Sequence, residues 1–388
     1  MHLDQEKPAA DLENWRRSPQ NQLAFHQLPA EISTARINAI CTNSVPFGSS
    51  TSSLADFSLR LPSGAKLGLE RFLEVTSTDA MIVLHAGKLV FETYRNGMDP
   101  SSLHIAMSAT KATVGLLSEI LATEGAVDLN APVTRYVPEI EKSHYAGATL
   151  RDLLDMRVGY VLSEQEEENY GRATGWQPSK MRESGLKEFF EGLRGEPSEC
   201  GGPFRYQSAN TDLLGWALER ATSCDVPSLL SKKLWTPLAA EQHAAITLDR
   251  AGLSRSAGGF CATARDFARL GLLVSRNGHL DKAPVFSGAV VDGLIKAGNR
   301  KAWSSGQWGE SFAAISPHMS YRSGWYTIDG DRPLLFAMGI HGQNLFIDRI
   351  NSIVIVKFSS WAQPVDSRLM WLTHAAEAEI SRCLLSVG

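Results

Sequence analysis

The sequence predicts an α/β protein in which a mainly antiparallel sheet is flanked by helices and joined to a second, mostly helical lobe. Three observations predict this class. Strand-like runs occur at residues 80–94, helical periodicity dominates the middle of the chain, and more strand-like runs and a helix close it. Because strands occur towards both ends, we expect them to share one sheet. Residues 1–125 and 280–388 should form the α/β domain, and residues 126–279 the helical domain.

The first strands and the first long helix follow one another directly. Residues 80–85 and 88–94 are rich in β-branched and aromatic side chains and flank Ala86-Gly87, which is typical of a hairpin. After Pro100 the apolar spacing becomes helical. This spacing predicts a helix over residues 107–124, which ends before Gly125.

The middle of the chain carries three more helix signals. It also contains one long segment that shows no helix signal. Residues 149–152 have capping-box spacing, residues 210–221 are periodic, and residues 263–266 open another helix. Residues 160–205 are irregular, acidic and glycine-rich. A long segment of this kind inside a compact domain is often a lid, so we expect a lid loop at about residues 157–180.

The end of the chain returns to strands. Residues 333–340, 343–348 and 352–360 are apolar and β-branched and are joined by short turns, which predicts an antiparallel meander. An amphipathic helix over residues 367–385 closes the chain. A ligand site is expected between the sheet and the helical lobe.

Composition excludes several classes of function. The chain has 388 residues, 43% of them hydrophobic, and a net charge of −4, so we expect neither a nucleic-acid partner nor a membrane span. The polar N-terminus lacks the apolar stretch of a secretory signal. The five cysteines are scattered without a CxxC pair, which favours a reducing, cytoplasmic location over a disulfide framework or zinc ribbon. No metal and no cofactor is predicted.

Ser108 and Lys111 stand at the head of the first long predicted helix, where positions three apart share a face. A serine hydroxyl needs an adjacent base to become a nucleophile. A lysine is such a base only where burial or a nearby cation lowers its pKa. The pair would also fit a capping serine and a solvated lysine. The apolar neighbours favour a catalytic site, in which the N–H of Ser108 could donate to an oxyanion.

Two more segments complete a candidate site. Tyr206 and Ser208 alternate, so they would share one face of an extended segment before a helix that begins near Asn210. A phenol there could relay protons, although a half-buried core tyrosine is the commoner case. On the third predicted strand from the end, Gly339 would allow close approach of a ligand to the backbone of Ile340, unless it is simply a bulge or turn glycine.

These three elements, in this order, resemble the penicillin-recognising serine hydrolases, which comprise serine β-lactamases, DD-peptidases and esterase relatives. The family's SxxK motif is similar to Ser108–Lys111, its Tyr-x-Ser element to residues 206–208, and its third element falls at residues 337–339. Within the family, the 6-aminohexanoate-dimer hydrolases, nylon-oligomer hydrolases with carboxylesterase activity, are the most similar branch. The stretches that carry this closer resemblance are residues 12–28, 204–222, 258–271, 339–348 and 352–361.

The resemblance implies a β-lactamase/DD-peptidase-like fold and a role for each motif residue. Ser108 would be the acylated nucleophile, and Lys111 and Tyr206 would share the acid and base work. The N–H groups of Ser108 and Ile340 would form the oxyanion hole. In this branch a lid tyrosine and tryptophan contact the substrate, and the corresponding residues are Tyr160 and Trp176. The remaining substrate-binding candidates are Tyr170, Gly171, Ser208, Gly339 and His341.

Two departures from the family pattern narrow the expected activity. Ala337 replaces the basic residue of the third element, which holds the carboxylate of penicillin-type substrates, so β-lactamase activity is not expected. Gly171 stands where some nylon-dimer hydrolases carry an acid that would hold the substrate ammonium, which argues against efficient dimer hydrolysis. Ester hydrolysis does not need that contact. The acidic run 164–168 is interpreted as a solvated lid face.

The sequence therefore predicts a serine hydrolase that acts on carboxylic esters, and on small linear amides, through an acyl-enzyme. The expected partner is a small-molecule ester or amide, and a homodimer is left open. Two alternatives stand beside it: a β-lactamase or DD-peptidase, and a non-catalytic binding protein of the same fold.

Overall fold

The structure is a computed structural model that describes residues 10–41, 44, 46–179, 185–280, 283–330 and 333–386. Its main element is a seven-stranded antiparallel sheet in the order β11-β12-β13-β14-β15-β4-β5. The strands are β4 (Thr78–His85), β5 (Lys88–Tyr94), β11 (Met319–Arg322), β12 (Trp325–Ile328), β13 (Leu334–Gly339), β14 (Gln343–Asp348) and β15 (Ile353–Ser359). Strand β15 pairs with β4, so both ends of the chain meet in one sheet, as predicted.

The predicted hairpin and meander are both present. Ala86 and Gly87 have φ values of 50° and 77°, and left-handed backbone at both turn positions matches the twist of a two-residue hairpin loop. The remaining strands are β1 (Thr34–Ile37), β7 (Ala244–Thr247), β8 (Phe260–Ala262) and β6 (His104–Ile105), which form a second sheet in that order, and the pairs β2 (Ser58–Arg60) with β3 (Lys66–Gly68) and β9 (His279–Leu280) with β10 (Ala283–Pro284).

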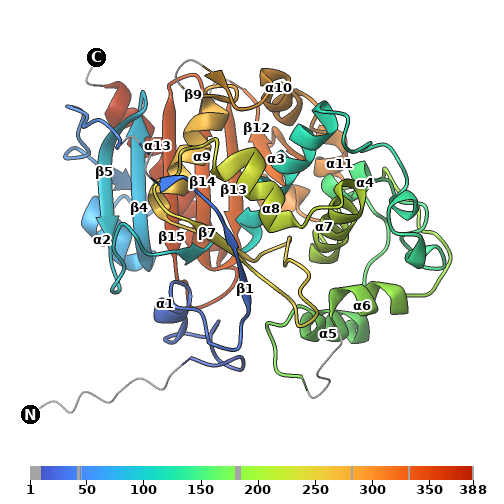
Figure 1. Cartoon of the computed structure of the whole chain (residues 1–388). Helices are drawn as coiled ribbons and strands as arrows, with labels where there is room; N and C mark the ends of the chain where they lie inside the picture. Colours follow the sequence, from blue (N-terminus) through green and yellow to red (C-terminus); the bar gives the residue numbers. More distant parts are fainter. Residues whose placement is uncertain are drawn as a thin grey trace, which may run out of the picture.

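Helices cover the large sheet and fill the space beside it (Figure 1). The α-helices are α1 (Asn21–Ala24), α2 (Leu69–Val75), α3 (Thr110–Thr123), α4 (Leu150–Leu154), α5 (Glu164–Ala173), α6 (Leu186–Gly192), α7 (Ser208–Thr222), α8 (Val226–Leu230), α9 (Ala264–Ser275), α10 (Gly288–Lys296), α11 (Arg300–Ser304), α12 (Gly309–Phe312) and α13 (Ser367–Leu385). The shorter turns are η2 (Met107–Ala109), η3 (Val133–Arg135), η4 (Pro138–Ile140), η5 (Ser231–Trp235) and η6 (Ile340–Gly342).

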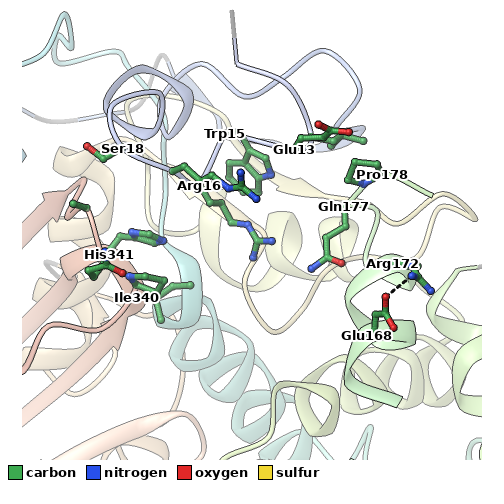
Figure 2. A pocket seen from close by; sticks show the side chains of 15 residues that line it. Glu13, Trp15, Arg16, Ser18, Glu168, Arg172, Gln177, Pro178, Ile340 and His341 are labelled. Carbon is green, nitrogen blue, oxygen red and sulfur yellow. Dashed lines mark hydrogen bonds and ion pairs between the residues drawn. The ribbon is translucent and has the colours of Figure 1, made fainter. Parts of the chain in front are cut away.

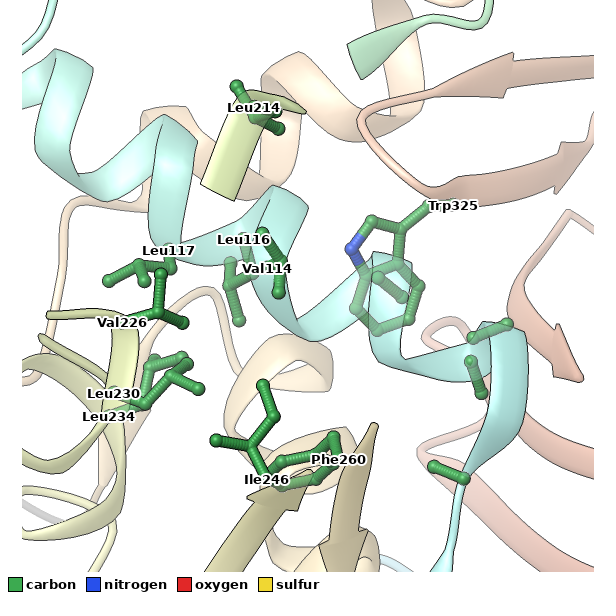
Figure 3. Close-up of a cluster of buried hydrophobic side chains, with 14 of the residues drawn as sticks. Val114, Leu116, Leu117, Leu214, Val226, Leu230, Leu234, Ile246, Phe260 and Trp325 are labelled. Atoms are coloured by element: carbon green, nitrogen blue, oxygen red, sulfur yellow. The ribbon is translucent and has the colours of Figure 1, made fainter. Parts of the chain in front are cut away.

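Helix α3 is a largely buried helix. Most of its residues are buried, and Val114, Leu116 and Leu117 pack into an apolar cluster with side chains from α8, β7 and β8 (Figure 3). A β-carbon on Gly115 would lie 1.8 Å from the carbonyl oxygen of Ser323, so only glycine permits this approach to the β11–β12 turn. A helix that is apolar all round is held by its surroundings, and its first turn is therefore fixed in position.

Two sequence-based expectations need correction. The segment 160–205 is not irregular, because α5 and α6 form within it; Ser163 and Glu166 make the capping box that starts α5. Helix α7 starts at Ser208, two residues earlier than expected, and Gln207 is the last extended residue. The acidic run 164–168 is largely exposed on α5, as interpreted.

The predicted division into two domains remains a prediction. Helix α9 lies in the range 126–279 but packs against β4, β14 and β15 of the large sheet. In the ranges given above, no helix is both long and apolar enough to cross a bilayer. The five cysteines are free thiols.

Candidate active site

Ser108, Lys111 and Tyr206 meet at the first turn of α3. The Oγ atom of Ser108 lies 3.0 Å from Nζ of Lys111 and 2.6 Å from the hydroxyl of Tyr206, which donates to it. Ser108 lies on the short turn η2, and Lys111 follows one helical turn later on α3. Tyr206 comes from the extended segment before α7. The structure thus brings together the three residues that the sequence motifs single out.

The turn that carries Ser108 has unusual backbone geometry. Met107 has a φ of 47°, which costs a non-glycine residue roughly 1–2 kcal/mol. The turn connects β6 to α3, and the N–H of Ala106 donates to the carbonyl of Phe260 in the second sheet, 2.8 Å away. Strained residues of this kind cluster at active sites, where the surrounding structure holds them.

Lys111 is buried, with 2% of its surface exposed. Its Nζ donates to the carbonyl of Ala257 (2.7 Å) and to Oγ of Ser208 (3.2 Å), besides its contact with Ser108. Burial lowers the pKa of Lys111 below its ordinary value; the phenol of Tyr206 opposes that shift, and the charge of Arg255 adds to it. A lysine in this setting is poised to act as a neutral base.

Two further contacts hold Tyr206 in place. Its N–H donates to Oε1 of Gln307 (2.9 Å), and its ring stacks on Trp308 with centroids 4.4 Å apart. The next residue, Gln207, points the other way and donates to the hydroxyl of Tyr145 (2.5 Å). Tyr206 and Ser208 therefore both face α3, which agrees with the alternation in the sequence. Gln307 and Trp308 were missed, because nothing local links positions a hundred residues apart.

A buried ion pair positions the carbonyl group that Lys111 contacts. Oδ1 of Asp212 on α7 accepts the N–H of Ala257 (2.8 Å), while its other oxygen pairs with Arg255. The hydroxyl of Tyr170 also donates to Asp212 (2.5 Å), and Tyr170 is 5% exposed. Asp212, Arg255 and Ala257 lie in or beside the stretches that carried the resemblance, but their roles depend on contacts that spacing does not reveal.

The end of β13 runs directly against the Ser108 turn. A β-carbon on Gly339 would lie 2.5 Å from the carbonyl oxygen of Ala106 and 3.0 Å from the N atom of Ser108. Gly339 is therefore required for close approach, and it brings the backbone of Ile340 beside the turn. His341 is buried, with Nδ1 2.7 Å from the carbonyl of Trp361, and burial lowers its pKa.

The predicted lid residues make contacts of their own, and Trp176 packs in one apolar cluster with Met107. The ring of Tyr160 stacks on His144 with centroids 4.1 Å apart. The indole of Trp176 is 5% exposed and donates to Oγ1 of Thr247 (3.0 Å). Gly171 lies on α5, where a β-carbon would meet the side-chain nitrogen of Gln177 at 2.9 Å. Substrate contact by these residues, by Tyr170 and by His341 stays a prediction.

A cavity of about 850 Å³ opens beside Ile340. Ile340, His341, Arg16, Glu168 and Gln177 surround it, together with other residues of the N-terminal segment and of residues 362–364 (Figure 2). A cavity of this size is suited to a small molecule. Among the residues that the structure describes, no cluster of three or more histidine, cysteine or acidic side chains could hold a metal ion.

Comparison with known proteins agrees with this geometry. The family profile named Beta-lactamase matches residues 70–379, which is most of the chain. The chain belongs to the beta-lactamase family. It is a serine hydrolase of this family.

Two proteins are similar over nearly the whole chain, and a third shares the fold. The 6-aminohexanoate-dimer hydrolase of Paenarthrobacter ureafaciens is 34% identical over 385 residues, covering 97% of this chain and 94% of that protein. A structure from Bacillus anthracis, assigned as a 6-aminohexanoate-dimer hydrolase, has a TM-score of 0.82 at 25% identity and covers 96% of both chains. A D-stereospecific amidohydrolase from Streptomyces shares the fold, with a TM-score of 0.59 at 15% identity over 80% of this chain and 97% of the other.

Proposed function

We propose that this member of the beta-lactamase family hydrolyses carboxylic esters and small linear amides through an acyl-enzyme on Ser108. The observation that carries the proposal is the position of Ser108 Oγ, within hydrogen-bonding distance of both Lys111 Nζ (3.0 Å) and the Tyr206 hydroxyl (2.6 Å). One neighbour can take the serine proton, and the other can return a proton to the leaving group.

The contacts of Lys111 orient it as a base. A neutral amine has two N–H groups and one lone pair. The two N–H groups are directed to the carbonyl of Ala257 and to Oγ of Ser208, so the lone pair faces Ser108 Oγ. Burial favours this neutral form. As Ser108 attacks the substrate carbonyl, its proton passes to Lys111.

The negative charge that forms on the carbonyl oxygen is stabilised by the N–H groups of Ser108 and Ile340. The approach of Gly339 to the Ser108 turn brings these two backbone positions together. Tyr206 then protonates the leaving alcohol or amine and recovers a proton from Lys111. Water attacks the acyl-enzyme by the reverse path, releases the acid and restores Ser108.

Penicillin-type substrates fit this site poorly. Ala337 is fully buried in β13, and its position offers no cation or hydroxyl to a substrate carboxylate. We therefore expect no turnover of nitrocefin, and rapid turnover would favour a β-lactamase instead.

Intact-mass spectrometry with a p-nitrophenyl phosphonate tests the nucleophile. The wild type should gain the mass of one phosphonyl group and lose activity, and the Ser108→Ala protein should gain none. An equal mass gain on both proteins, or no gain on the wild type, would overturn the assignment. A Ser118→Ala protein is the matched control, because Ser118 is a buried serine of α3 whose hydroxyl donates to the carbonyl of Val114.

Hydrolysis of the linear 6-aminohexanoate dimer is the second candidate, and the 34% identity to the Paenarthrobacter enzyme favours it. Gly171 lacks the acid that would hold the substrate ammonium. We therefore expect slow dimer hydrolysis beside fast hydrolysis of p-nitrophenyl acetate, and faster dimer hydrolysis in Gly171→Asp. The new side chain would have to displace the flexible amide of Gln177. Unchanged dimer turnover in a folded Gly171→Asp protein would contradict the ammonium argument.

A further inference from the structure

Arg16 is a partly buried cation that lies beside two aromatic rings, which are in edge-to-face contact with each other. Its guanidinium lies 5.5 Å from the ring centroid of Trp15 and 5.9 Å from that of Trp176, so two indoles hold it in place. Among the described residues, no carboxylate accepts a hydrogen bond from it or pairs with it. Arginines buried in this way usually pair with an anion.

The charges around Arg16 leave its cation uncompensated. Burial lowers its pKa, and the neighbouring cations Arg255 and Arg17 lower it further, whereas no acid in the described part of the chain raises it. Two acids do line the same cavity, but Glu168 already pairs with Arg172, and Glu13 is exposed. The cavity therefore has an unmet preference for an anion beside Arg16.

The place of Arg16 in the cavity connects this preference for an anion with substrate binding. Arg16 lines the same cavity as Ile340, the proposed oxyanion donor, and its charge acts on His341 next in the chain (Figure 2). Ser108, Lys111 and Tyr206 do not line this cavity, so a substrate held at Ser108 would reach Arg16 by extending past Ile340. An anionic group on that extension would meet the guanidinium fork, which binds carboxylates through two parallel N–H donors.

We propose that Arg16 binds a carboxylate of the substrate, so that the preferred substrates are esters or amides that carry a second, free carboxylate group. The inference rests on the proposed hydrolytic function and specifies its substrate class. It also assigns to the N-terminal segment the anion contact that Ala337 cannot provide from β13.

Matched substrate pairs, each a free carboxylate and its neutral methyl ester, test this proposal. One pair is mono-p-nitrophenyl adipate and its methyl ester, with the carboxylate on the acyl side. The other is 4-acetoxybenzoate and its methyl ester, with the carboxylate on the leaving group. For each pair, the ratio of kcat/KM for the anionic over the neutral ester is measured in the wild type, Arg16→Met, Arg16→Lys and Arg17→Met. Thermal melting confirms that each protein is folded.

In the wild type, the ratio should exceed one for at least one pair, and that pair identifies the side of the substrate that enters the cavity. Arg16→Met should lower this ratio by about 10- to 100-fold, which is the usual effect of losing a hydrogen-bonded charge. Arg16→Lys should restore part of it. Arg17 lines the same cavity but is exposed, so Arg17→Met should change the ratio by less than about threefold.

Three results would overturn the proposal: ratios below one for both pairs in the wild type, an unchanged ratio in folded Arg16→Met, or an equal loss in Arg17→Met. If the wild type cleaves none of the four esters, the proposed function fails, and calorimetric titration with adipate tests the anion site by itself. Binding to the wild type that is weakened at least tenfold in Arg16→Met then supports the site, and equal or absent binding overturns it.

Discussion

The hydroxyl of Tyr206 lies 2.6 Å from Oγ of Ser108, although 98 positions separate the two residues in the chain. The same Oγ atom is 3.0 Å from Nζ of Lys111. A serine between a phenol and a buried amine has one route for losing its proton and a second for passing a proton to a leaving group.

Replacing Tyr206 by phenylalanine should lower kcat for p-nitrophenyl acetate by about 10²- to 10⁴-fold, because a general acid is lost. The ring would keep its stacking on Trp308, so the melting temperature should hardly change. Tyr136→Phe is the control, since the hydroxyl of Tyr136 only accepts the N–H of Asp128. Wild-type kcat in Tyr206→Phe would refute the assigned role.

Removing the charge of Arg255 should shift the pH dependence of the reaction. Burial and Arg255 both lower the pKa of Lys111. Without Arg255 that pKa rises, so less of Lys111 is neutral at a given pH, and the acid limb of kcat/KM in Arg255→Gln should move to higher pH. The measurement is a pH–rate profile.

This substitution also leaves Asp212 without its cation, so a loss of about 3–5 kcal/mol in the free energy of unfolding is expected. Arg151→Gln is the matched control, because it breaks another largely buried pair, with Glu119 at 2.7 Å. It should destabilise the protein without moving the acid limb. A limb that stays in place in Arg255→Gln, or moves to lower pH, would disprove the electrostatic link.

A single methyl group at position 339 should damage the site. In Gly339→Ala the new carbon would meet the carbonyl oxygen of Ala106 at 2.5 Å and the N atom of Ser108 at 3.0 Å, which pushes the two oxyanion donors apart. The rates of reaction with the phosphonate and with p-nitrophenyl acetate should fall by about 10²-fold or more, which is the usual effect of losing one oxyanion donor.

Gly293→Ala provides the comparison for that change. Gly293 lies on α10, and no described atom lies within 4 Å of the place where its β-carbon would be, so alanine there should leave activity alone and raise helix stability by up to about 1 kcal/mol. Equal kinetics in the two alanine proteins would mean that the approach of β13 to the Ser108 turn is not needed.

Lys357 should make stability depend on pH. It is 1% exposed on β15, and burial lowers its pKa to about 7, with Asp79 opposing the shift. Between pH 7 and the ordinary lysine pKa near 10.4, the unfolded chain holds one more proton than the folded one. The free energy of unfolding should therefore rise by about 1.4 kcal/mol per pH unit in this range from Lys357 alone.

Denaturant unfolding at a series of pH values checks this sign. Lys357→Met should remove that slope, and its stability relative to the wild type should be greatest below pH 7, where the wild type buries a charge. Lys88→Met, on the exposed part of β5, should keep the slope. An identical slope in the wild type and in Lys357→Met would show that the buried amine does not titrate in this range.

Local patterns allowed much of the fold to be predicted. The hairpin at Ala86-Gly87, the capping box at Thr149 and the last helix all depend on residues a few positions apart, whose propensities act before any tertiary contact forms. The segment 160–205 was misjudged for the opposite reason. Helix α5 is polar and lacks a strong apolar face, so its capping box and its packing through Tyr170 and Ala173 outweigh a weak periodicity.

The candidate site also combines features that follow from the sequence with features that only the fold reveals. The sequence by itself determined the chemistry that was available: a serine and a lysine one helical turn apart, a tyrosine alternating with a second serine, and a glycine on a late strand. Only the tertiary structure decided their environment. The burial of Lys111, the ion pair of Asp212 and the uncompensated charge of Arg16 depend on packing between distant segments, because desolvation and charge act through space and not along the chain.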